Sequence, residues 1–203
     1  MRRFLWLAGI LLATAIPANA QQLTPQYEFS GGYDYTLFPN SEGKPHLNMN
    51  GWDIGGAYNW RRHFAAAFDV SGLYNTQSSS NPGINGIITH VYSFAVGPRI
   101  YPFGHHKLTP YGQFLFGDGH ISQFLPGVPP FPATTVKDNS FTVIAGGGVD
   151  INWTEHWAIK LVEADYVHSN FFTNRSSGVG QGEERLVVGV VYRFGVAAAR
   201  GKK

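Results

Sequence analysis

Apolar side chains recur at every second position in eight separate stretches of this chain. In the last stretch, RLVVGVVYRFG, the alternate residues from Leu186 to Phe194 are apolar, whereas the residues between them include Arg185 and Arg193. A strand directs successive side chains to opposite faces, so this period indicates strands with one apolar and one polar face. The predicted strands cover residues 27–38, 51–60, 64–74, 90–101, 108–117, 140–151, 157–167 and 185–195.

The seventh stretch, WAIKLVEADYV, departs from regular alternation. Glu163 and Asp165 cannot share a face with Lys160 in a regular strand, because each lies an odd number of positions along the chain from Lys160. With both carboxylates on the polar face, Lys160 is expected to extend its charged head to the water interface near one strand end. A bulge would serve equally well.

The links between the stretches alternate in length. Long links rich in Asn, Ser, Gly and Pro cover about residues 39–47, 75–87, 119–139 and 168–183, and the links between them, around 59–63, 101–107 and 152–156, are short. Such links join adjacent antiparallel strands and place all the long links at one end. The sequence therefore predicts an all-β fold, an eight-stranded antiparallel up-and-down transmembrane β-barrel with both termini periplasmic.

The first twenty residues predict export. Arg2 and Arg3 precede an apolar run, and Ala18-Asn19-Ala20 resembles a cleavage site, so residues 1–20 are expected to be a cleaved signal peptide. The barrel is then expected at 21–195 and a short C-terminal tail at 196–203. Without Arg2 and Arg3 the chain is formally neutral, which gives no basic surplus for nucleic acid. The absence of cysteine excludes disulfides and thiolate metal sites.

The apolar faces are expected to contact outer-membrane lipid, and the polar faces to line the barrel interior. Because eight strands enclose a space that side chains fill, a paired polar core is expected, with a narrow ion or proton path as the alternative. Aromatic residues near strand ends are expected at the membrane interfaces: Trp60, Trp153, Trp157, Tyr101 and Tyr192. The charged residues expected inside are Glu28, Asp34, Asp53, Asp69, Asp150, Glu163, Asp165, Arg99, Arg185 and Arg193.

The segment Gly189 to Phe194, GVVYRF, resembles the C-terminal β-signal of the eight-stranded outer-membrane β-barrel superfamily, which includes the OmpA membrane domain and OmpX-like barrels. The segments VGPRIY at 96–101 and EADY at 163–166 resemble strands of the same superfamily. The resemblance covers about residues 26–195 and implies location in the outer membrane of a Gram-negative-type cell. It also implies that the barrel assembly machinery reads the 189–194 signal, although here this signal lies nine residues before the chain end.

Two groups of residues suggest chemistry. His168 and Ser169, with Glu183 and Glu184 downstream, resemble the His, Ser and Glu set of lipid A deacylases, which makes a lipid-modifying hydrolase the alternative function. Adjacent residues in a regular strand point to opposite faces, which counts against this alternative. His105 and His106 are expected in a solvated turn, with no third ligand placed for a metal. No catalytic, metal-binding or cofactor residues are therefore predicted.

The long link at 119–139 is more apolar than a solvated loop requires. It carries Phe124, Leu125, Val128 and Phe131, and is expected to cover the barrel mouth or to present an adhesive surface. The resulting expectation is a non-enzymatic integral outer-membrane protein, with a structural or surface-interaction role through four exposed loops and an unknown loop ligand. A soluble lipocalin-like exported barrel, apolar inside and polar outside, is the remaining alternative.

Overall fold

The computed structural model describes residues 24–38, 47–77, 86–127, 132–169, 171 and 181–196. The predicted signal peptide and residues 197–203 of the predicted tail lie outside this part of the chain. Eight strands follow one another, each long enough to cross a bilayer. They are β1 (Pro25–Phe38), β2 (Leu47–Arg61), β3 (Phe64–Gln77), β4 (Ile87–Ile100), β5 (Leu108–Leu125), β6 (Thr134–Asn152), β7 (Trp157–Ser169) and β8 (Gln181–Val196).

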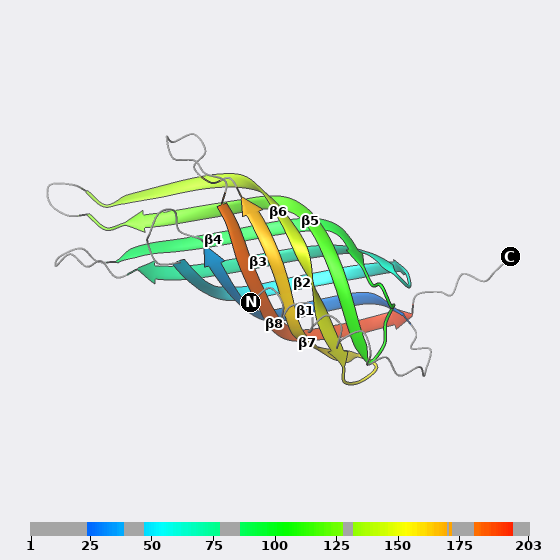
Figure 1. Ribbon diagram of the computed structural model, residues 1–203. Helices are drawn as coiled ribbons and strands as arrows, with labels where there is room; N and C mark the ends of the chain where they lie inside the picture. Colours follow the sequence, from blue (N-terminus) through cyan, green and yellow to red (C-terminus); the bar gives the residue numbers. More distant parts are fainter. Residues whose placement is uncertain are drawn as a thin grey trace, which may run out of the picture.

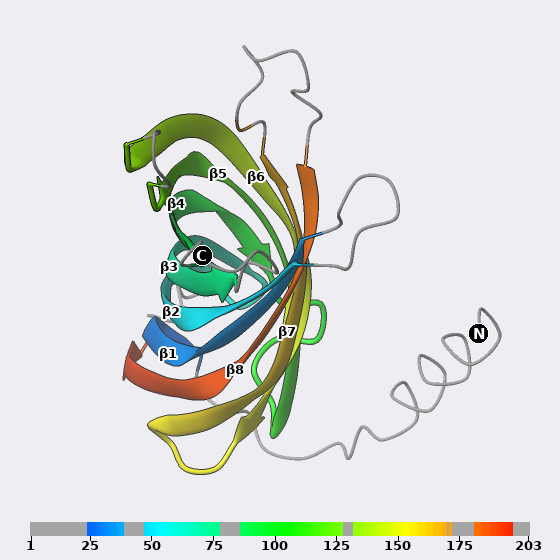
Figure 2. The same cartoon turned by 90° about the vertical axis from the view of Figure 1, so that its left-hand side faces the viewer.

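The strands form one closed barrel in which each strand pairs antiparallel with the next. β8 returns to β1, with Val188 opposite Tyr33, so the first and last strands complete the ring. Figure 2 shows the strands curving around a common interior. This topology confirms the predicted eight-stranded antiparallel barrel.

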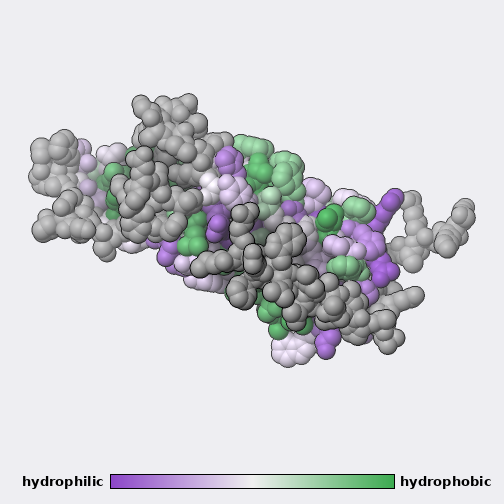
Figure 3. Space-filling model, in the orientation of Figure 1, coloured by the Kyte–Doolittle hydropathy of each residue, from purple (hydrophilic) through white to green (hydrophobic). Residues whose placement is uncertain are grey.

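Inward and outward residues alternate along the strands, as expected, except at Leu161 and Val162 of β7, which are both exposed. Asp34 and Arg185 are buried inside, whereas Phe94 and Val190 on the outer wall are each 52% exposed. Figure 3 shows apolar side chains on the visible part of the barrel wall. A polar interior within an apolar wall is the reverse of the lipocalin arrangement, so that alternative is wrong. Within the described ranges, no helix has the length and apolar character needed to cross a membrane.

Aromatic side chains ring the outer wall at two levels. Near the short turns, which we call the turn end, the exposed aromatic residues include Tyr58, Trp60 and Trp157. At the opposite end, the loop end, Trp52 donates a hydrogen bond of 3.1 Å to the hydroxyl of Tyr74. On β3 the two levels are marked by the exposed rings of Phe64 and Tyr74, ten positions apart, which matches the roughly 9 to 11 residues that carry a tilted strand across a bilayer.

The barrel is taller on the side of β3 to β6 than on the other side (Figure 1). β5 and β6 stay paired as far as Leu125 opposite Thr134, whereas the pairing of β6 with β7 begins only at Thr142 opposite Ser169. The predicted long loop at 119–139 is therefore wrong over most of its length, because residues 119–125 and 134–139 are strand. Val128 and Phe131 lie outside the described residues.

Candidate functional site

The barrel interior holds a network of buried charges centred on Arg185 of β8. The guanidinium donates to both carboxylate oxygens of Asp69 at 2.8 and 3.0 Å, and Nη2 donates to Asp165 at 2.6 Å. Carboxylate oxygens of Asp53 and Asp34 lie 3.8 and 4.0 Å from Nη1. A buried guanidinium is tolerated when several carboxylates accept its protons in good geometry, which is the case here.

A bulge in β7 brings Lys160 into this network. The register between β7 and β8 shifts between Lys160 and Glu163, so both residues point inward. Lys160 Nζ lies 2.8 Å from Glu163 Oε2 and 3.7 Å from Asp53 Oδ1. Of the two expectations for Lys160, the bulge is confirmed, and extension to the water interface is wrong, since the side chain is only 2% exposed. Pairing with two carboxylates inside the barrel offsets the cost of burying the ammonium group.

Arg99 of β4 extends the network toward the turn end. Its guanidinium donates to Gln113 Oε1 at 2.6 and 3.1 Å and lies 4.4 Å from the centre of the Tyr111 ring. The Tyr111 hydroxyl donates to Glu163, and Gln113 Nε2 donates to Asp165 at 3.2 Å. Gln113 thus bridges Arg99 to the carboxylate that Arg185 also contacts, which joins the two arginines through side chains.

The carboxylate of Glu28 contacts several buried polar side chains at the turn end. His105 Nε2 lies 2.6 Å from its Oε1, and Asn59 Nδ2 donates to the same oxygen at 2.7 Å. Tyr101 donates to it at 3.3 Å, and burial raises the pKa of the Tyr101 phenol well above its usual range, so the hydroxyl keeps its proton. Two expectations are corrected: His105 is buried rather than solvated, and Tyr101 is inside rather than at the membrane interface.

Arg193 of β8 connects Glu28 to a second carboxylate. Its Nε lies 3.4 Å from Glu28 Oε2, and its Nη2 donates to Asp150 at 2.8 Å. The expected inward position of Arg193 is thereby confirmed, and it carries two partners that sit on different strands, β1 and β6. This contact lies close to the seam where β8 meets β1.

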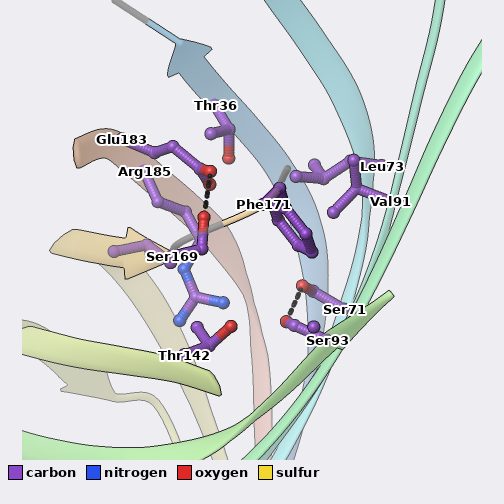
Figure 4. Close-up of a pocket in the computed structure, with 12 residues that line it drawn as sticks. Thr36, Ser71, Leu73, Val91, Ser93, Thr142, Ser169, Phe171, Glu183 and Arg185 are labelled. Carbon is purple, nitrogen blue, oxygen red and sulfur yellow. Dashed lines mark hydrogen bonds between the residues drawn. The ribbon is translucent and has the colours of Figure 1, made fainter. Parts of the chain in front are cut away.

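An apolar cluster fills the interior at the loop end. It comprises Phe38, Met49, Leu73, Val91, Ile121 and Phe171. The Phe171 ring lies against Gly119 of β5, where a Cβ atom would come within 2.8 Å of Phe171 Cζ. Between this cluster and Arg185 lies a cavity of about 20 Å³, enough for about one water molecule (Figure 4). Phe171, from the link after β7, therefore fills part of the interior at the loop end.

His168 and Ser169 do not form a catalytic pair in this structure. Ser169 points inward and donates to Glu183 Oε1 at 3.0 Å (Figure 4). Strand alternation directs the neighbouring His168 to the outer face. No histidine contacts the Ser169 hydroxyl among the hydrogen bonds of the described residues. Within the described ranges, no histidine is therefore placed to act on Ser169 as the general base of a serine hydrolase.

Eight carboxylates and four Lys or Arg side chains are buried in the described part of the chain. All ten interior charges expected from the sequence are among them, and the two that sequence reasoning missed are Lys160 and Glu183. Extending the Arg185 alternation two residues back would have found Glu183. Oxygens of Asp53, Asp69 and Glu163 lie within 4.8 Å of one another, but Lys160 and Arg185 already contact this group. These three carboxylates are therefore paired with cations of the protein itself.

A closed ring of eight antiparallel strands, an apolar outer wall with aromatic residues at two levels, and a charged interior define an integral outer-membrane β-barrel. A model of the outer membrane protein beta-barrel domain family matches residues 7–194, and the chain belongs to this family. This family places the protein in the outer membrane.

Solved structures share the fold at low sequence identity. The crystal structure of Ail, the attachment invasion locus protein of Yersinia pestis, gives a TM-score of 0.62 at 17% identity, covering 85% of this chain and 100% of Ail. Neisserial surface protein A gives 0.58 at 14% identity, covering 83% of this chain and 97% of that one. No curated protein sequence matches the chain.

Proposed function

We propose that this protein is a non-enzymatic outer-membrane anchor that uses its loop end to bind a partner outside the cell. The observation that carries the proposal is the β5–β6 hairpin, which remains paired through Leu125 and Thr134, far beyond the last β6–β7 pair. Phe124 and Leu125 near its tip are 40% and 38% exposed. A stiff hairpin that presents apolar side chains suits contact with another surface better than a solvated loop does.

The filled interior supports anchoring rather than transport. Arg185, Lys160 and Arg99 link carboxylates from several strands across the barrel, and the cluster with Phe171 lies above them. Such packing fixes the shape of the wall that carries the hairpin. The placement of Ser169 against Glu183, with His168 on the other face, gives no support to the hydrolase alternative.

The test compares bacteria that display the parent protein with bacteria that display a variant whose residues 123–136 are replaced by Asn-Gly. The replacement joins Ser122 to Lys137, which are paired in the parent, through a two-residue hairpin turn. Attachment is measured on mammalian cells and on heparin, because a heparin analogue is present in one structure of Ail. Loss of attachment with retained heat-modifiable gel mobility supports the proposal.

A parallel assay tests the anchoring role. Liposomes containing the parent protein are expected to retain small sugars as well as protein-free liposomes do. If the parent mediates no attachment, or if it renders liposomes leaky to sugars, the proposed function is wrong.

A further inference from the structure

An apolar groove on the outer wall lies close to the turn end. It has a volume of about 540 Å³, within the range of about 300 to 1,000 Å³ typical of ligand pockets. Its lining belongs to four strands, β1 to β4, and includes Tyr58 and Trp60 of β2 and Pro98 of β4. The groove therefore lies on the face that meets lipid, at the level of the turn-end aromatic residues.

The register of β2, β3 and β4 explains why the wall is hollow here. Ala66 of β3 pairs with Tyr58 on one side and with Pro98 on the other, so a small side chain stands between two larger ones. Two pairs further along, on the same face, the ring of Phe68 lies over Gly56, where a Cβ atom would come within 2.5 Å of the ring. Phe68 thus leans toward β2 and leaves the space above Ala66 open.

A basic cluster lies at the end of the same strands. Arg61 and Arg62 directly follow Trp60, which lines the groove, and both side chains are exposed. The neighbouring β4–β5 turn carries His106 and exposed Lys107, and Arg62 Nη2 lies 3.5 Å from His106 Nε2. Neither turn, 61–63 or 101–107, contains an acidic residue. Figure 3 shows strongly hydrophilic side chains at this end of the molecule.

We propose that the groove binds one acyl chain of an anionic glycerophospholipid whose phosphate lies against Arg61 and Arg62. Both termini and the short turns of this barrel class face the periplasm, so the lipid belongs to the inner leaflet. The apolar lining of the groove matches the acyl chain of such a lipid, and the arginines at its end match the phosphate. The aromatic ring of Trp60 lies at the boundary between the two. The site is independent of the partner proposed for the loop end.

The experiment is native mass spectrometry of the folded protein in detergent, titrated with dioleoyl phosphatidylglycerol or dioleoyl phosphatidylcholine. One phosphatidylglycerol molecule is expected to stay bound at concentrations that leave phosphatidylcholine unbound. Replacing both Arg61→Gln and Arg62→Gln is expected to weaken this binding about tenfold, the order expected for two basic residues near an anionic headgroup. Ala66→Trp fills the groove and is expected to abolish retention of phosphatidylglycerol.

Two variants serve as matched controls. Lys137→Gln removes an exposed cation from the loop end, and Val70→Trp enlarges a side chain on the same outer face of β3 but outside the groove lining. Both are expected to bind phosphatidylglycerol as the parent does, and heat-modifiable mobility confirms that each variant is folded. Equal retention of the two lipids by the parent, or unchanged retention by folded Ala66→Trp, overturns the proposal.

Discussion

Arg185 and Asp69 form a two-point ion pair across the barrel interior, with N to O distances of 2.8 and 3.0 Å. Their strands, β8 and β3, are not neighbours in the barrel, so this ion pair, which we call the Arg185–Asp69 strut, crosses the interior and does not join adjacent strands of the wall. The same guanidinium contacts Asp165 of β7. One side chain therefore connects three strands of the ring.

Removing this strut should destabilise the barrel. Arg185→Leu leaves Asp69 and Asp165 buried without their main cation, which is expected to cost about 3 to 5 kcal/mol. Arg185→Lys retains the positive charge but not the planar guanidinium that donates to both oxygens of Asp69, so it should lower the free energy of unfolding by less than Arg185→Leu does. Urea unfolding in lipid vesicles measures both, and an Arg185→Leu protein as stable as the parent would contradict the proposed role of the pair.

Lys160 and Glu163 should be energetically coupled through the bulge. A double-mutant cycle with Lys160→Met and Glu163→Gln is expected to give a coupling energy of about 0.5 to 3 kcal/mol, because the Nζ to Oε2 distance is 2.8 Å. If Lys160 were at the water interface instead, the losses in free energy of unfolding caused by the two single substitutions would add, and the coupling energy would be close to zero.

Phe171 should stabilise the loop end of the interior. Phe171→Ala is expected to cost about 3 to 5 kcal/mol, because the ring is buried in the apolar cluster and packs on Gly119. Phe141→Ala, on the outer wall and 61% exposed, is the control and should cost less. Equal losses for the two variants would show that Phe171 does not pack as described.

Ser169 should contribute to stability and not to hydrolysis. Ser169→Ala removes the donor to Glu183 and is expected to cost about 1 to 3 kcal/mol, whereas His168→Ala on the outer face should stay within about 0.5 kcal/mol of the parent. A lipid-hydrolysis assay on the parent is expected to show no turnover. Turnover that disappears in Ser169→Ala would restore the hydrolase alternative.

Val190 should tolerate apolar residues and reject charge. It is half exposed on the outer wall opposite Gly31, within the apolar band. Val190→Arg is therefore expected to cost about 2 to 4 kcal/mol in a bilayer, and Val190→Leu close to nothing. In a soluble barrel an exposed arginine would be harmless, so this comparison measures the contact with lipid directly.

The alternation of residues was sufficient to predict the eight strands and ten of the twelve interior charges among the described residues, because burial inside and lipid outside impose a period of two along the strands. It was not sufficient beyond the membrane. Residues 134–139 of β6 are exposed or half-buried on both faces of the strand, so their side chains show no alternation between apolar and polar residues and resemble those of a loop. The sequence left two positions open for Lys160, because a single bulge changes the face of the residues that follow it and the pattern alone does not show whether a bulge is present. The hollow at Ala66 depends on which residues lie opposite it, which only the register reveals.

The contact of Arg193 with Glu28 and Asp150 bears on the order in which the barrel forms. Glu28 belongs to the first strand and Arg193 to the last, so synthesis delivers the carboxylate long before its cation. Until β8 docks, Glu28 and Asp150 face an interior that lacks this positive charge. Pairing of β8 with β1 places Arg193 opposite Glu28, so closure of the ring also gives this buried carboxylate its arginine partner.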